Sequence, residues 1–133
     1  MREILFRGKR VGSIDNGKWV YGDLLHDGFD YDTAIWEKET KMVVEVDPST
    51  VGQYTGMTAN GKRIFEGDVI KSYQGKILAV KFGQYRDDEE VVSGNGWYVS
   101  GEYGTLSFDE RWGGHEIIGN IHDNPELMEG EHE

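Results

Sequence analysis

The stretch that decides the fold is VGQYTGMTANGKRIFEGDVIKSY, which runs from Val51 to Tyr73. Asn60-Gly61 in its middle is a two-residue turn that needs positive φ at both positions, and Asn and Gly tolerate that conformation. The segments on either side are rich in β-branched and aromatic residues and are interrupted by glycine, which is typical of strands. Gly67-Asp68 predicts a bend or bulge that redirects the chain into the apolar run Val69 to Tyr73. The stretch therefore predicts a hairpin and a sharp corner, as at the start of a small antiparallel barrel.

The length of 133 residues predicts one domain or two small β subdomains. Four Trp, seven Tyr and five Phe supply anchors for a core in a chain without cysteine. The lack of cysteine excludes disulfide bonds and thiolate metal ligands, and it suits a reducing compartment. The N-terminal REILFRGKR is too charged for a signal peptide, and no run approaches the roughly 20 apolar residues of a membrane span. We therefore expect a cytoplasmic protein that does not enter a membrane.

The formal net charge is -11 at pH 7. A general binder of phosphate backbones needs a basic surface, so this charge argues against nucleic acid as a partner. It leaves basic or neutral proteins open as partners.

The remaining segments also predict an antiparallel all-β protein, because turn dipeptides separate short segments with strand alternation. Pro48 should end a strand, begin one helical turn and mark a boundary between subdomains. We expect an N-terminal β subdomain over 1–48, a barrel-like part over 49–127 and a frayed tail over 128–133. The segment 28–41 has no sustained period and predicts either a loop or short irregular strands, with Thr33 to Glu37 as the candidate strand. Asn124-Pro125 predicts a short C-terminal helical turn.

Four blocks of the sequence carry a resemblance to a known family. They are ILFRGKRV, WVYGDLL, TVGQYTGMTANGKRIFEGDVI and EIIGNIHDNPEL. In this order and spacing the chain resembles the YopX family of bacteriophage and prophage proteins, from Met1 to about Leu127. The resemblance implies a phage or prophage origin, an all-β fold with a small Src-homology-type (SH3-like) barrel in the C-terminal part, and no established activity. The segments Asp27 to Lys41 and Arg86 to Val92 lie outside the pattern.

His115, Glu116, His122 and Asp123 form two His-acidic pairs seven residues apart, which suggests a metal site. If Glu116 to Ile121 is one strand, positions seven apart fall on opposite faces, so the two histidines cannot converge without a bulge. Exposed polar residues at the ends of a strand are the favoured interpretation, and we predict no metal site.

Catalytic motifs are absent from the sequence. There is no cysteine, no G-x-S-x-G elbow, and no glycine loop of the phosphate-binding type. Glu66-Gly67-Asp68 offers two carboxylates, but a structural role, with Asp68 accepting local backbone hydrogen bonds, is favoured over acid-base chemistry. We therefore predict no catalytic residue, no cofactor and a protein that is not an enzyme.

The leading functional hypothesis is a protein-interaction module for an unknown host or phage protein, with exposed aromatic residues beside an acidic rim. Trp112 lies in a loop, whereas core positions are favoured for Tyr54 and Trp97. The run YRDDEE lacks the spacing of a calcium loop and is either a solvated loop or a contact surface. The predicted interaction residues are Trp112, Tyr85, Asp87, Asp88, Glu89 and Glu90.

Two alternatives stay open. Single-stranded nucleic acid could bind a small barrel through stacked aromatics, with cations from Arg2, Arg7, Lys9 and Arg10 or from Lys62-Arg63. The overall charge opposes this, although it would permit an acidic mimic of nucleic acid. A homo-oligomer could form through edge strands at Ile4 to Phe6 and Met42 to Val46.

Overall fold

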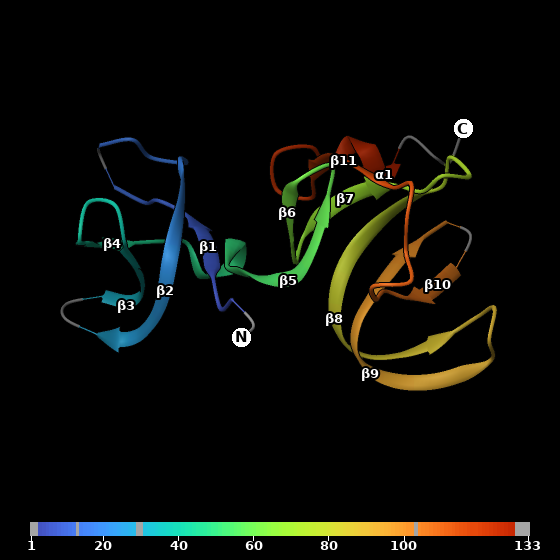
Figure 1. The fold of residues 1–133 in the computed structure, drawn as a ribbon. Helices are drawn as coiled ribbons and strands as arrows, with labels where there is room; N and C mark the ends of the chain where they lie inside the picture. Colours follow the sequence, from blue (N-terminus) through green and yellow to red (C-terminus); the bar gives the residue numbers. More distant parts are fainter. Residues whose placement is uncertain (1–2, 13, 29–30, 103, 130–133) are drawn as a thin grey trace. The chain divides into compact units, whose positions relative to one another are not determined.

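The computed structural model describes residues 3–12, 14–28, 31–102 and 104–129. Antiparallel strands follow one another, with a 3-10 turn in the middle and a short α-helix at the end (Figure 1). The elements up to the middle are β1 (Phe6–Lys9), β2 (Trp19–Gly28), β3 (Tyr31–Glu37), β4 (Met42–Glu45), the 3-10 turn η1 (Pro48–Thr50) and β5 (Gly52–Ala59). The later elements are β6 (Lys62–Phe65), β7 (Asp68–Lys71), β8 (Ile77–Asp87), β9 (Val92–Gly101), β10 (Gly104–Ser107), β11 (Glu116–Asn120) and α1 (Glu126–Glu129).

The strands form two antiparallel sheets. One has the order β4-β3-β2-β1-β5-β6 and the other the order β10-β9-β8-β7-β11. The all-β prediction is thereby confirmed. The sheets are not closed, so the small SH3-like barrel expected in the C-terminal part is not confirmed. The chain divides into two compact units after Gly56, later than the boundary that Pro48 predicts.

The central stretch folds as its residues predict. Asn60 and Gly61 have φ values of 52° and 80°, so both turn positions are left-handed. Gly67 has φ 93° at the corner between β6 and β7. Asp68 is buried there, and its Oδ2 accepts a hydrogen bond of 2.7 Å from the Phe65 N–H. The predicted structural role of Asp68 is confirmed, and so are the helical turns at Pro48 and after Asn124.

Half of the segment 28–41 is strand: β3 covers Tyr31–Glu37 and pairs with β2, so the short strand predicted at Thr33 to Glu37 is confirmed and begins two residues earlier. Another expectation about strands was wrong. The strand expected at Ile4 to Phe6 is not a free edge: β1 begins at Phe6 and pairs with β2 on one side and β5 on the other. β4 does lie at the end of its sheet, as the edge prediction for this segment requires. Of the expected tail, Met128 and Glu129 belong to α1, and residues 130–133 lie outside the described part.

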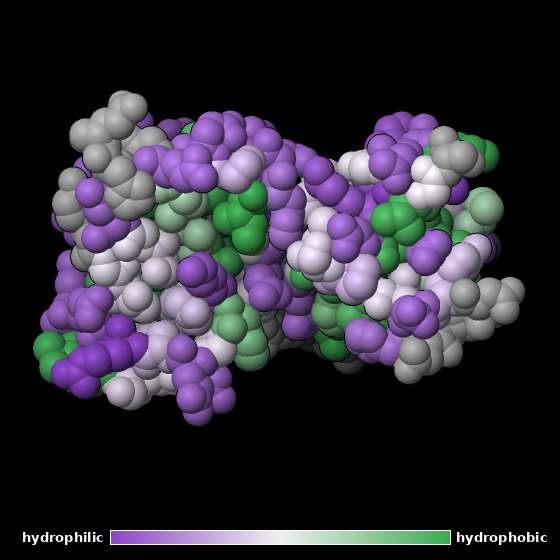
Figure 2. All heavy atoms as spheres, turned by 180° about the vertical axis from the view of Figure 1, so that it is seen from behind, coloured by the Kyte–Doolittle hydropathy of each residue, from purple (hydrophilic) through white to green (hydrophobic). Residues whose placement is uncertain are grey.

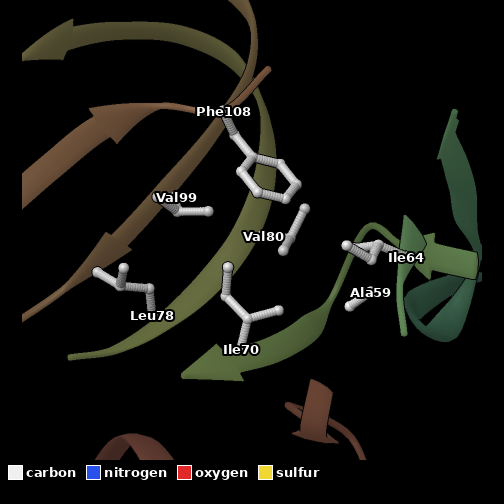
Figure 3. Packing of buried hydrophobic residues seen from close by; sticks show 7 residues of the cluster. All are labelled: Ala59, Ile64, Ile70, Leu78, Val80, Val99 and Phe108. Carbon is white, nitrogen blue, oxygen red and sulfur yellow. The ribbon is translucent and has the colours of Figure 1, made fainter. Parts of the chain in front are cut away.

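Each unit has its own buried cluster. In the first unit Val20, Ile35, Val44 and Val46 pack together. In the second unit the cluster draws on several strands and on Phe108, which follows β10 (Figure 3). Its members are Ala59, Ile64, Ile70, Leu78, Val80, Val99 and Phe108. Tyr54 is buried and Trp97 packs against the second cluster, as the sequence predicts. Hydrophilic side chains cover much of the face seen in Figure 2.

Gly22 offers a direct test of the first sheet. It pairs with Phe6 on β1 and Glu37 on β3, and a Cβ there would collide with the carbonyl oxygen of Trp36. We expect Gly22→Ala to lower the free energy of unfolding by about 2–3 kcal/mol, because the β2–β3 ladder must shift. Chemical denaturation measures this. Gly113→Ala is the control, since its added Cβ meets no atom within 4 Å. Equal stabilities of the two variants would contradict the register.

Candidate functional site

The acidic turn after β8 folds onto β10. Asp87 pairs with Val92 across the β8–β9 hairpin, and the Val91 N–H donates to the Asp87 carbonyl over 2.9 Å. Asp88 faces Thr105: its N–H donates to the Thr105 carbonyl (2.9 Å), and its Oδ2 accepts from the Thr105 N–H (2.8 Å). Two residues of the predicted acidic rim are therefore used to attach the turn to a neighbouring strand.

Asp87 is the buried centre of this attachment, with 3% of its surface exposed. Its Oδ1 accepts the N–H groups of Glu89 and Glu90, both at 2.9 Å, and its Oδ2 accepts the Ser107 N–H at 2.7 Å. Burial alone would raise the pKa of this carboxyl, but the hydrogen bonds from Glu90, Ser107 and Glu89 outweigh it and lower the pKa to about 2. Asp87 therefore carries a fixed negative charge that faces the backbone.

Trp112 is attached to Ser107, the residue whose N–H donates to Asp87. Its Nε1–H donates to the Ser107 carbonyl over 2.7 Å. Its ring meets Phe108 edge-on at a centroid distance of 5.4 Å and lies 6.1 Å from the ring of His115. Trp112 is therefore half-buried and held in one orientation, rather than fully exposed in a loop.

Arg111 joins the Trp112 loop to the acidic turn. Its guanidinium contacts Asp109 Oδ2 at 3.0 Å and Glu90 Oε1 at 3.2 Å. The hydrogen bond from Arg111 lowers the pKa of Asp109, and the same contact raises the pKa of Arg111. The Arg111 side chain is still 65% exposed, so these ion pairs lie in solvent.

Two hollows lie beside Tyr73 and Trp112, and both are lined by these two residues and by Gly113. The smaller has a volume of about 240 Å³ and is lined by Tyr73, Asp87, Glu89, Glu90, Leu106, Ser107, Arg111, Trp112 and Gly113. The larger has a volume of about 540 Å³, and His115, Glu116, Lys71 and Ser72 contribute to its wall. Tyr73 is 75% exposed at the turn between β7 and β8. We call Tyr73, Glu89, Glu90, Arg111 and Trp112 the Trp112 site.

The structure brings four of the six predicted interaction residues to one hollow: Trp112, Asp87, Glu89 and Glu90. Asp88 is engaged with Thr105. Tyr85 lies elsewhere on the hairpin, half-buried, with its ring stacked on Tyr98 at 5.2 Å and its hydroxyl donating to Ser107 Oγ at 3.1 Å. Sequence reasoning missed Tyr73 and Arg111. The available signal was the position of Tyr73 directly before the tight turn Gln74-Gly75.

The histidine pairs do not form a recognisable metal centre. In the part of the chain that the structure describes, no group of three or more His, Cys, Asp or Glu residues could hold an ion. β11 does have a register shift between Ile117 and Gly119. His115 instead packs edge-on against Phe108 at 5.7 Å, and both of its ring nitrogens are buried without a hydrogen-bond partner.

The basic residues near the N-terminus lie against an aromatic ring. Arg7 is buried, and its guanidinium carbon lies 4.5 Å from the ring centroid of Trp19. The Lys9 ammonium lies 5.5 Å from the same centroid. Arg2 of the predicted basic cluster falls outside the described residues. Two of these cations therefore have a cation–π contact inside the first unit.

A family model described as YopX protein matches residues 6–129. A search of curated proteins finds no match. None of the described helices is long and apolar enough to cross a membrane.

The contacts of Asp87 predict how stability depends on pH. We expect Asp87→Asn to lower the free energy of unfolding at pH 7 by roughly 2 kcal/mol, because it loses a charged acceptor of three backbone N–H groups. The folded pKa of about 2 lies below the unfolded value of 3.8, so this stabilisation is full above the unfolded pKa and is lost as pH falls toward 2. Denaturation between pH 2 and 7 measures it. A wild-type and variant difference that stays constant over this range would contradict the assignment.

Val91 predicts a stabilising substitution. It has φ 55° in the turn after Asp87, a conformation that β-branched residues rarely adopt. We expect Val91→Gly to raise the free energy of unfolding by about 1 kcal/mol, since glycine adopts this φ without the steric cost. Val92→Gly in the adjoining strand is the control and should lower stability. If Val91→Gly is destabilising, the left-handed conformation is not the dominant cost at this position.

Proposed function

The chain belongs to the YopX family, and we propose that it is a phage accessory protein that acts as a non-enzymatic protein-interaction module. We propose the Trp112 site as its contact surface and the host cytoplasm as its place of action. The single observation that carries this proposal is a largely exposed Tyr73 next to a fixed Trp112, both lining a hollow with carboxylates.

The aromatic pair has the composition of an interface hot spot, since Trp, Tyr and Arg dominate binding energy in protein interfaces. Trp112 is held by its hydrogen bond to Ser107 and by its contact with Phe108. A partner would therefore not have to order this ring, which reduces the entropic cost of association. Tyr73 adds an exposed ring beside it.

The charge around these rings favours a basic partner. The smaller hollow is lined by Glu89, Glu90 and the buried, ionised Asp87. Complementary charge speeds encounter and disfavours partners of the same sign. The net charge of -11 acts in the same direction at long range.

Binding of single-stranded nucleic acid is supported less well. Arg7 and Lys9, two of the cations that it would use, contact Trp19 within the first unit. The other expected cations, Lys62 and Arg63, are on β6 and not in the Trp112 site.

A capture experiment tests the proposal. Tagged full-length protein is incubated with lysate of a bacterial host at moderate salt, with and without nuclease, and retained proteins are identified by mass spectrometry. We expect a specific protein to survive nuclease treatment and to be lost with Tyr73→Ala. Tyr31→Ala, an exposed tyrosine of the first unit, is the control and should retain the partner. Capture that disappears with nuclease, or that is indifferent to Tyr73→Ala, would overturn the proposal.

A further inference from the structure

We propose that the smaller hollow of the Trp112 site binds the guanidinium group of an arginine side chain from the partner protein. This inference rests on the proposed function and specifies the chemistry that the partner must present. It concerns one hollow within the second unit, lined by residues from the β7–β8 turn, the β8–β9 turn, β10 and the loop after β10.

The size of the hollow favours a single side chain. Its volume of about 240 Å³ lies below the roughly 300–1,000 Å³ of typical small-molecule sites. It is also too small for a helix or a strand of a partner. An extended side chain that enters from the surface is the occupant that fits.

The walls favour a flat cation. Tyr73, Leu106 and Trp112 supply two aromatic rings and an aliphatic group. A guanidinium is planar and weakly hydrated, so it stacks on aromatic faces more readily than an ammonium does. The Nε1–H of Trp112 is already bonded to Ser107, which leaves the π system of the ring for contact.

Carboxylates at the rim supply the counter-charge. Among the residues that the structure describes, none pairs with the carboxylate of Glu89, although its N–H is bonded to Asp87. The carboxylate of Glu90 contacts the exposed guanidinium of Arg111 and no other group of the described residues. The guanidinium of an arginine has several N–H donors in one plane, so it can donate hydrogen bonds to the carboxylates of Glu89 and Glu90 at the same time.

Arg111 shows that a guanidinium is accepted at this rim. It lies among the lining residues and bonds Glu90 through one nitrogen, while Asp109 holds it through Nε and Nη2. Exposed ion pairs contribute only about 0–1 kcal/mol, so exchanging the Glu90 contact costs little. An incoming arginine can take Glu90 while Arg111 stays with Asp109.

Titration of the full chain with blocked tripeptides tests the inference. Gly-Arg-Gly is compared with its citrulline analogue, which has the same shape but no charge, and with Gly-Lys-Gly. The readout is the NMR shift of the Trp112 indole N–H and of the Glu89, Glu90 and Ser107 amides. We expect saturable shifts with the arginine peptide and at least tenfold weaker binding of the other two. The indoles of Trp19, Trp36 and Trp97 should not move.

Matched variants test whether the carboxylates of Glu89 and Glu90 bind the arginine. Glu89→Gln combined with Glu90→Gln should weaken arginine binding at least fivefold. Glu39→Gln is the control, because Glu39 has the position in the turn 38–41 that Glu89 has in the turn 88–91. Equal affinity for arginine and citrulline, equal affinity for arginine and lysine, or an unchanged affinity in the double variant would overturn the inference.

The two proposals fail separately. If the arginine peptide does not bind but Tyr73→Ala still abolishes capture of the partner, the guanidinium inference is wrong and the interaction surface stands. If Tyr73→Ala leaves capture unchanged, the proposed function is wrong whatever the peptides do.

Discussion

The site depends on one buried carboxylate and the three backbone N–H groups that it accepts. Burying an ionised group is costly unless hydrogen bonds replace its hydration, so Asp87 holds its donors where they are. Two of these donors, Glu89 and Glu90, shape the acidic turn, and the third, Ser107, belongs to β10. The carbonyl of Ser107 in turn accepts the Trp112 Nε1–H. The backbone of a single residue thus connects the acidic turn to the aromatic ring.

These contacts also indicate what kind of chemistry the site supports. The pKa values of Asp87 and Asp109 are both lowered, so these groups stay ionised at neutral pH. A general acid or base needs a pKa near the working pH, and both shifts go in the other direction. Fixed charges of this kind serve recognition, where a steady potential is an advantage. The lowered pKa values of Asp87 and Asp109 therefore do not favour proton transfer by these two carboxylates.

Local signals of the sequence predicted the turns and the elements near them. Asn60-Gly61 and Gly67-Asp68 have conformations that few other residues adopt, so their meaning did not depend on the rest of the chain. β3 could be predicted only as a short irregular strand, because Thr33, Ala34 and Ile35 are all buried, and burial on both faces removes the alternation that identifies a strand. The central place of β1 was also hidden, since its partner β5 lies more than forty residues away in the chain. Trp112 and the acidic run could each be proposed as interaction residues from the sequence. Their connection through Ser107 could not, because it joins residues that are distant in the chain.

A comparison of the turns 38–41 and 88–91 shows why the turn sequence alone does not make a site. The turns 38–41 and 88–91 each end with a non-glycine residue at φ 60° or 55° and close with an N–H bond to Glu37 or Asp87. The Glu37 carboxylate accepts the Thr40 hydroxyl at 2.7 Å, in solvent. The carboxylate of Asp87 is instead buried against β10 and reaches Ser107. The shorter side chain of Asp, at the same position of the same type of turn, accepts the backbone N–H groups of its own turn and of a neighbouring strand. Attachment to β10, and not the geometry of the turn, therefore gives the second unit a fixed acidic surface that the first turn lacks.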